Sequence, residues 1–214
     1  QKLARIFLEL QDQGAHNINL VTATQYLPSI LNALDLVKNQ LEIPVVYNSS
    51  GYEKPETIRL LKGYVDIYLP DLKYFSSELS RKYSKAEDYF EVASCAIKLM
   101  IEQTGTPVFD SDGMLQKGVI VRHLVLPNCR KDSISLLHWL KETLPDKHYL
   151  ISLLSQYTPF YNSHKYPELN RRITTYEYES ILKEAISLGL VEGFMQEKSS
   201  AKEEYTPPFD LEGL

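Results

Sequence analysis

Short apolar runs alternate with longer amphipathic stretches along most of the chain. Apolar residues fill nearly every position of the short runs, which is typical of strands buried on both faces of a sheet. In the longer stretches apolar residues recur every three or four positions, which predicts helices with one buried face. The pattern therefore predicts strands over 16–22, 44–48, 64–69, 119–126, 149–154 and 193–196, and helices over 26–39, from Pro55, and over 87–103, 132–143 and 174–188.

This order of elements predicts an α/β fold in which helices cover a parallel sheet. A doubly wound sheet and a β/α barrel both satisfy the pattern. Complete barrels usually need about 250 residues, so five or six strand–helix units in 214 residues predict a partial barrel. No G-x-G-x-x-G or P-loop string occurs. We expect one body over 1–196, with a hairpin turn at 110–113, and an extended polar tail over 197–214.

The chain opens on an amphipathic segment with apolar residues at positions 3, 6, 7 and 10, and Gly14 ends it. No Ser, Thr, Asp or Asn precedes the segment as a cap. A core-facing helix seldom begins a domain uncapped, and the first residue is Gln1 rather than Met. We therefore expect further sequence upstream, including the first strand of the barrel.

Charge and cysteine content exclude several classes of protein. The 23 basic and 28 acidic residues give a net charge of −5, which argues against electrostatic binding to nucleic acid. No apolar run approaches the ~20 residues that span a bilayer, so no membrane partner is expected. The two cysteines exclude a disulfide framework and favour a reducing, cytoplasmic compartment. We expect Cys95 in the core and Cys129 in a loop that permits its exposure.

Hydrogen-bonding residues follow each of the first five predicted strands. The carboxyl ends of parallel strands meet at one edge of a sheet, where ligands bind in such folds. Thr24, Ser49, Gly51 and Asn128 fit turn or cap roles equally well. The hydrogen-bonding residues at the ends of the five strands lie in the segments 22–25, 48–51, 70–73, 122–128 and 155–157.

Asp71 and Lys73 stand out because residues two apart on an extended segment point to the same side. A carboxylate and an ammonium at a strand end can hold a zwitterionic ligand or pair with each other. A desolvated lysine can also form a Schiff base.

Arg122 follows three apolar residues within a predicted strand. A guanidinium there needs a partner, because burying an unpaired charge is very unfavourable. We expect that partner to be Asp71 or the carboxylate of a ligand, and we favour the ligand. His123 points to the opposite face, where we expect it to pack with its hydrogen bonds satisfied.

Several of these strings together resemble radical S-adenosylmethionine enzymes, most closely the pyruvate formate-lyase activating enzyme-like iron–sulfur proteins. The strings are Val-Thr-Ala-Thr at 21–24, Tyr-Asn-Ser-Ser-Gly-Tyr at 47–52, Val-Asp-Ile-Tyr-Leu-Pro-Asp-Leu-Lys at 65–73 and Val-Arg-His-Leu-Val-Leu-Pro at 121–127. The resemblance covers almost the whole chain, including 153–159 and 167–172.

The resemblance implies a partial β/α barrel that binds S-adenosylmethionine and carries a [4Fe–4S] cluster on a C-x-x-x-C-x-x-C loop. In that family, reductive cleavage of S-adenosylmethionine yields a 5′-deoxyadenosyl radical, with flavodoxin or ferredoxin as the electron donor. Activating enzymes use the radical on a glycyl-radical partner protein such as pyruvate formate-lyase. By resemblance, the cofactor-binding residues are Thr22, Thr24, Asn48, Ser50, Asp71, Lys73, Arg122 and Gln156.

Within that set, Arg122 corresponds to the arginine that reaches the methionine carboxylate. Thr22 and Thr24 replace the family's Gly-Gly-Glu segment, which contacts the methionine amino group, and Ser50 replaces an asparagine. No C-x-x-x-C-x-x-C string occurs in the chain. We therefore expect a fragment of a radical S-adenosylmethionine enzyme that lacks the first strand and the cluster loop, binds no metal and is inactive by itself. The alternative is a cluster-free β/α domain that binds a small molecule or a partner without catalysis.

Overall fold

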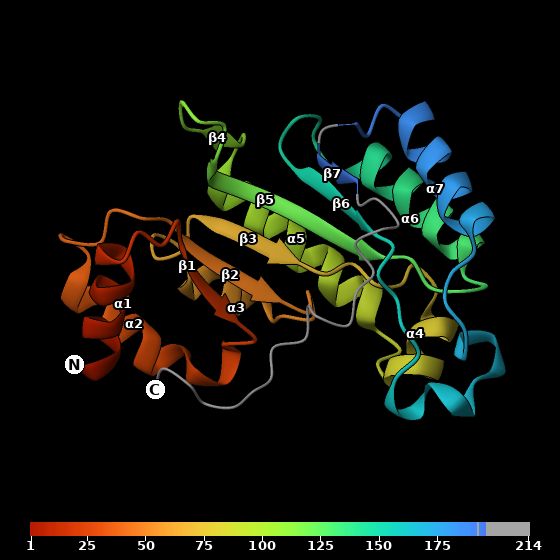
Figure 1. Ribbon diagram of the computed structural model, residues 1–214, viewed down its shortest axis with the longest axis horizontal. Coiled ribbons are helices and arrows are strands. Elements are labelled where there is room, and N and C mark those ends of the chain that lie inside the picture. Colours follow the sequence, from red (N-terminus) through yellow and green to blue (C-terminus); the bar gives the residue numbers. More distant parts are fainter. Residues whose placement is uncertain (192, 196–214) are drawn as a thin grey trace.

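The computed structural model describes residues 1–191 and 193–195. The strands of these residues form one seven-stranded sheet in the order β1-β2-β3-β5-β6-β7, with β4 beside β5 (Figure 1). Their bounds are β1 Ile18–Val21, β2 Val45–Ser49, β3 Ile67–Pro70, β4 Val108–Phe109, β5 Leu115–Leu124, β6 Leu150–Leu154 and β7 Gly193–Met195. The tail predicted over 197–214 lies outside the described residues.

All neighbours along this order are parallel, and β4 is antiparallel to β5. The β4–β5 hairpin confirms the turn predicted at 110–113. The helices are α1 Lys2–Asp12, α2 Leu27–Val37, α3 Pro55–Leu60, α4 Ser77–Ser84, α5 Tyr89–Thr104, α6 Arg130–Thr143 and α7 Thr175–Ser187, with short 3₁₀ turns η1 Thr24–Tyr26, η2 Tyr161–Lys165 and η3 Pro167–Leu169.

Consecutive strand order decides which face of the sheet the helices cover. Right-handed crossovers between neighbouring parallel strands place every connecting helix on the same face, and Figure 1 shows α3 and α5 behind β2, β3 and β5. Among the described strands, β1 and β7 each pair with one neighbour, so the sheet winds as a barrel does without closing. The structure thus confirms the expected α/β fold of the partial-barrel type.

Successive side chains of each strand point to opposite faces of the sheet, so one set packs into the core and the other lies on the opposite face. Tyr47 of β2 and Val121 of β5 point into the core beneath the helices, where both are fully buried. Their neighbours Asn48 and Arg122 therefore point to the other face, which is the interior side of a barrel.

The predicted burial of Cys95 is wrong, and the loop position of Cys129 does not expose it. Cys95 is exposed on α5 and Cys129 is buried. The buried face of α5 is formed by Ala93, Ala96, Ile97 and Met100, and Cys95 lies off that stripe. Cys129 is held at the start of α6, where its carbonyl accepts a hydrogen bond from the Ser133 amide at 3.1 Å.

Among the described residues, the helices are too short or too polar to cross a membrane. The helix α4 has no counterpart among the predicted elements. Its sequence is mostly polar and only Ser80 of it is buried, so no apolar period signals it. Ser76 caps it instead, accepting from the Leu79 amide at 3.4 Å.

Candidate ligand site at the strand ends

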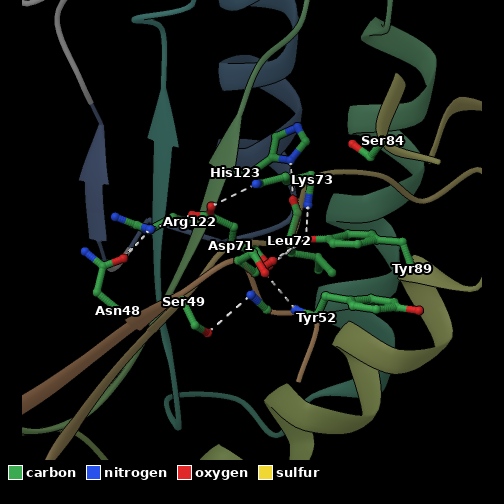
Figure 2. A network of polar contacts seen from close by, with 12 residues as sticks. Asn48, Ser49, Tyr52, Asp71, Leu72, Lys73, Ser84, Tyr89, Arg122 and His123 are labelled. Atoms are coloured by element: carbon green, nitrogen blue, oxygen red, sulfur yellow. Dashed lines mark hydrogen bonds and ion pairs between the residues drawn. The ribbon is translucent and has the colours of Figure 1, made fainter. Parts of the chain in front are cut away.

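Arg122 joins the ends of three strands. Its Nη2 donates to Oδ1 of Asn48 at 2.7 Å and lies 2.7 Å from Oδ1 of Asp71 (Figure 2). Asn48 is on β2, and Asp71 follows β3 and forms an isolated parallel bridge with Arg122. The Arg122 and Asp71 side chains are 25% and 23% exposed, so the ion pair is partly buried and partly exposed to solvent. The structure thus gives Arg122 the Asp71 partner, one of the two that we considered, and leaves its Nε without a partner among the described residues.

Lys73 lies on the outer side of the same carboxylate. Its Nζ is 3.4 Å from Oδ2 of Asp71, and its side chain is 38% exposed. Asp71 therefore has a cation at each oxygen, one on the sheet and one toward solvent. We call Asn48, Asp71, Lys73 and Arg122 the strand-end site.

Tyr89 of α5 fixes the backbone of this site. Its hydroxyl lies 2.9 Å from the carbonyl oxygens of both Ser50 and Asp71, and it accepts a hydrogen bond from the Lys73 amide at 3.1 Å. Burial raises the pKa of this phenol, so it stays protonated and able to donate. One side chain thus couples the segments that follow β2 and β3.

Gly51 permits the close approach of these two segments. A Cβ at this position would lie 2.0 Å from the carbonyl oxygen of Asp71, and its φ of +78° also favours glycine. The amide of Gly51 donates to the Ser49 hydroxyl at 3.3 Å. The glycine of the Asn-Ser-Ser-Gly string is therefore a structural requirement for the position of Asp71.

The hydroxyl of Thr24 lies in a second network, beneath the first two strands. It donates to Oε1 of Glu53 at 2.8 Å and lies 2.8 Å from the Tyr47 hydroxyl, which also donates to Glu53 at 3.1 Å. Glu53 is only 5% exposed, so these two donors compensate a buried carboxylate. The geometry thus gives Thr24 a structural partner, whereas its predicted contact with a cofactor stays a prediction.

The remaining predicted residues lie around the edge of the site. Thr22 is exposed with a φ of 50°, and its amide donates to the carbonyl of Asn48 at 2.9 Å. Ser50 is exposed, and its hydroxyl accepts from the Tyr52 amide at 3.4 Å. Gln156 is exposed on the segment that follows β6.

His123 packs with both ring nitrogens hydrogen-bonded, in agreement with the sequence-based expectation. Its Nδ1 lies 2.7 Å from the carbonyl of Leu72, which can only accept, so Nδ1 carries the hydrogen. Nε2 then accepts from the Ser133 hydroxyl at 2.9 Å. Burial lowers the pKa of His123, so the neutral ring is favoured.

The strand-end site fits the amino-acid end of S-adenosylmethionine. Nε of Arg122 is buried and has no hydrogen-bond partner among the described residues, which leaves a donor for a carboxylate. Lys73 supplies a second cation, and the oxygens of Asn48 and Asp71 can accept from an ammonium group.

The described part of the chain offers no ligand set for an iron–sulfur cluster. Its described residues contain no group of three or more potential metal ligands. The two cysteines of the sequence lie on α5 and at the start of α6, one exposed and one buried.

Sequence reasoning missed Tyr89 and Glu53. Tyr89 opens a helix remote in sequence from the strands it braces, so spacing offered no signal. Glu53 follows the Asn-Ser-Ser-Gly string by two positions, and a carboxylate so close to a strand end was the available signal.

The chain is similar to a curated protein in sequence and to a solved structure in fold. The chain is 33% identical over 187 residues to an uncharacterized protein of Methanocaldococcus jannaschii, covering 85% of this chain and 49% of that protein. The chain thus spans about half the length of this curated relative. No protein-family model matches the chain.

The fold is similar to the crystal structure of a domain of pyruvate-formate lyase-activating enzyme from Bacteroides vulgatus. The TM-score is 0.59, and the match covers 85% of this chain and 98% of that domain. The sequences are 14% identical, so the comparison establishes a shared fold.

Proposed function

We propose that this chain supplies the S-adenosylmethionine-binding part of a radical S-adenosylmethionine protein. The observation that carries the proposal is the meeting of Arg122, Asp71 and Asn48 at the carboxyl ends of β2, β3 and β5, with Nε of Arg122 left unpaired. The fold shared with a domain of a pyruvate-formate lyase-activating enzyme supports the same assignment.

In this proposal each group of the site has a separate role in binding. Nε of Arg122 and Nζ of Lys73 hold the methionine carboxylate, because they are the cationic donors on either side of Asp71. The ammonium group of the ligand donates to Asn48 and Asp71. Tyr89 keeps the two binding segments at a fixed separation, so little ordering free energy is lost when the ligand binds.

The radical chemistry belongs to a longer protein. A [4Fe–4S] cluster in such a protein would need ligands from outside these 214 residues, so this chain's own contribution is binding and orientation. A glycyl-radical protein as substrate, and flavodoxin or ferredoxin as electron donor, belong to the same proposal for the longer protein.

Calorimetric titration of the 214-residue chain with S-adenosylmethionine tests the binding role. Arg122→Gln should weaken binding by about tenfold or more, because a lost charge-assisted hydrogen bond costs roughly 1.5–3 kcal/mol. The matched control is Arg59→Gln, which removes an exposed arginine paired with Glu56 on α3. Equal affinity in the wild-type chain and Arg122→Gln contradicts the proposal.

Anaerobic reconstitution of the whole gene product with iron and sulfide tests the enzymatic part. Ultraviolet–visible and Mössbauer spectra should show a [4Fe–4S] centre. If the whole protein takes up no cluster, the proposal that it is a radical enzyme is contradicted, whatever the affinity of this chain for S-adenosylmethionine.

One observation favours a second function, a cluster-free domain that binds a zwitterionic small molecule. Asp71 and Asn48 already occupy Nη2 of Arg122, so the guanidinium has its counter-charge without any cofactor. Tight binding of S-adenosylmethionine by this chain without iron would favour that function, because a radical enzyme relies on its cluster for much of the affinity.

A further inference from the structure

An open groove walled by aromatic rings lies beyond the carboxyl ends of β5 and β6. Its volume is about 300 Å³. Leu126 lines it and follows Arg122 by four residues, so the groove begins no more than about 14 Å along the chain from the strand-end site. We call it the aromatic groove. The aromatic residues that line it are Tyr74, Tyr83, Tyr157, Phe160, Tyr161 and Tyr166.

Hydrogen bonds within the chain hold three of these tyrosine rings in place. The Tyr83 hydroxyl donates to Oε1 of Glu168 at 2.8 Å, and the Tyr157 hydroxyl donates to the carbonyl of Leu169 at 2.9 Å. The Tyr166 hydroxyl donates to a carbonyl of α4 at 3.0 Å. Because their polar ends are already bonded, these rings form a groove with fixed walls, and such a groove loses little ordering free energy on binding.

Two aromatic side chains at the rim of the groove are held in the solvent. Phe160 and Tyr161 are 85% and 79% exposed. Tyr161 has a φ of +52°, which is rare for a bulky side chain. The turn η2 maintains this arrangement, since the Ser163 amide donates to the Phe160 carbonyl at 3.1 Å. Large apolar side chains held exposed beside a groove indicate a surface that another segment covers.

The chemistry of the groove favours a proline-containing occupant. Aromatic-lined grooves bind extended proline-rich segments, because proline rings pack on the aromatic faces and the polyproline II conformation is already restricted before binding. The chain contains such a segment, Tyr-Thr-Pro-Pro-Phe at 205–209, which lies outside the described residues. We propose that the aromatic groove binds residues 205–209 of the same chain.

The topology of the sheet brings this segment within reach of the groove. β7 is parallel to β6, and Met195 pairs with Leu153. The chain therefore leaves the described residues at the edge of the sheet where Tyr157, four residues beyond Leu153, enters the groove. Pro207 follows Met195 by twelve residues, which can span up to about 40 Å.

Charge favours the same occupant. Residues 203–214 contain four carboxylate side chains and no lysine or arginine. The turn η2, at the rim of the groove, carries the exposed Lys165. Glu168 is paired with Lys82, so it adds no net negative charge that would repel an acidic segment. Opposite charges at the rim fix the orientation of a bound segment more than they raise its affinity.

Photo-crosslinking of the full chain tests the proposal. p-Benzoylphenylalanine is introduced in place of Phe209, and peptide mass spectrometry locates its crosslinks after irradiation. The crosslinks should fall on 157–166 and on Tyr83, in preference to Val108 and Phe109, which are also exposed and apolar. Mixing isotopically labelled and unlabelled chains identifies the source of the segment. Crosslinks within one chain join peptides of the same isotope, whereas mixed pairs would identify a second copy as the occupant and overturn the proposal.

Variants of the groove test whether the aromatic walls hold the segment. Phe160→Ser combined with Tyr161→Ser should lower the crosslink yield by about fivefold or more, because two aromatic contacts are lost. Both side chains are exposed, so the fold should be retained. The matched control is Phe109→Ser, which removes an exposed aromatic ring of β4 and should leave the yield unchanged.

Variants of the segment test the requirement for proline. Pro207→Ala combined with Pro208→Ala should lower the yield to a similar extent, whereas Thr206→Ala should retain it. An unchanged yield in either double variant, or crosslinks spread evenly over the surface, overturns the proposal. Since no step uses S-adenosylmethionine, failure here leaves the proposed function standing, and loss of binding in Arg122→Gln leaves this test unaffected.

Discussion

Arg122 and Asp71 face each other across a single parallel bridge, with Nη2 and Oδ1 2.7 Å apart. The bridge extends the contact between β3 and β5 beyond the end of β3, where Leu72 also donates its amide to the Arg122 carbonyl at 2.8 Å. The ion pair therefore belongs to the sheet as much as to the site. A ligand carboxylate has to share Arg122 with Asp71 rather than replace it.

Asp71→Asn should destabilise the chain by about 1–2 kcal/mol, because it leaves a mostly buried guanidinium without its counter-charge. Urea denaturation at neutral pH measures the change. Glu9→Gln is the control: its pair with Arg5 has side chains 55% and 70% exposed, and such pairs contribute at most about 1 kcal/mol. Equal midpoints for the two variants would show that the Arg122 charge is satisfied in another way.

Comparing Gly51→Ala with Gly63→Ala distinguishes the loss of stability caused by steric contact from the loss caused by backbone conformation. Both glycines have positive φ, +78° and +83°, but a Cβ at Gly63 meets nothing within 4 Å. Gly63→Ala should cost about 1–2 kcal/mol from the left-handed conformation alone. Gly51→Ala should cost about 3 kcal/mol or more, because Asp71 must also move. Denaturant midpoints measure both, and similar losses would contradict the close approach of the two segments.

Stability should decline as the pH falls below about 6.5. Burial holds the pKa of His123 below its usual value, so in this range the unfolded chain takes up a proton that the folded chain refuses. The contribution is present above the unfolded pKa and is lost on acidification. Urea unfolding between pH 7.5 and about 5 measures the slope.

His123→Gln should be less stable at neutral pH and show a shallower slope in that range. His164→Gln, at an exposed position, is the control and should retain the wild-type slope. A slope in His123→Gln as steep as in the wild-type chain would assign the pH dependence to other groups.

One thiol per folded chain should react with a disulfide reagent, and it should be Cys95. Cys129 is buried, and burial raises its pKa to about 11, so little thiolate is present at neutral pH. Thiol titration with and without denaturant measures this, and the Cys95→Ser variant should lose the fast reaction. Two fast thiols in the folded chain would be inconsistent with the position of Cys129 at the start of α6.

The hydrophobic pattern was sufficient to predict most of the fold. Near-continuous apolar runs separated by amphipathic stretches leave few arrangements other than helices over a parallel sheet. The pattern failed where an element has little apolar signal: α4 buries only Ser80, so capping by Ser76 had to be seen in three dimensions. It also misplaced Cys95, because a position beside apolar neighbours in sequence can lie off the buried stripe of a helix.

The sequence by itself determined that Asp71, Lys73 and Arg122 carry charge at strand ends, because strand polarity and alternation are local properties. Only the tertiary structure decided that Arg122 reaches both Asn48 and Asp71, since that depends on which strands are neighbours. The contacts of Tyr89 depend on the tertiary structure as well, because this residue of α5 joins Ser50 and Asp71, which lie on two segments distant from it in sequence.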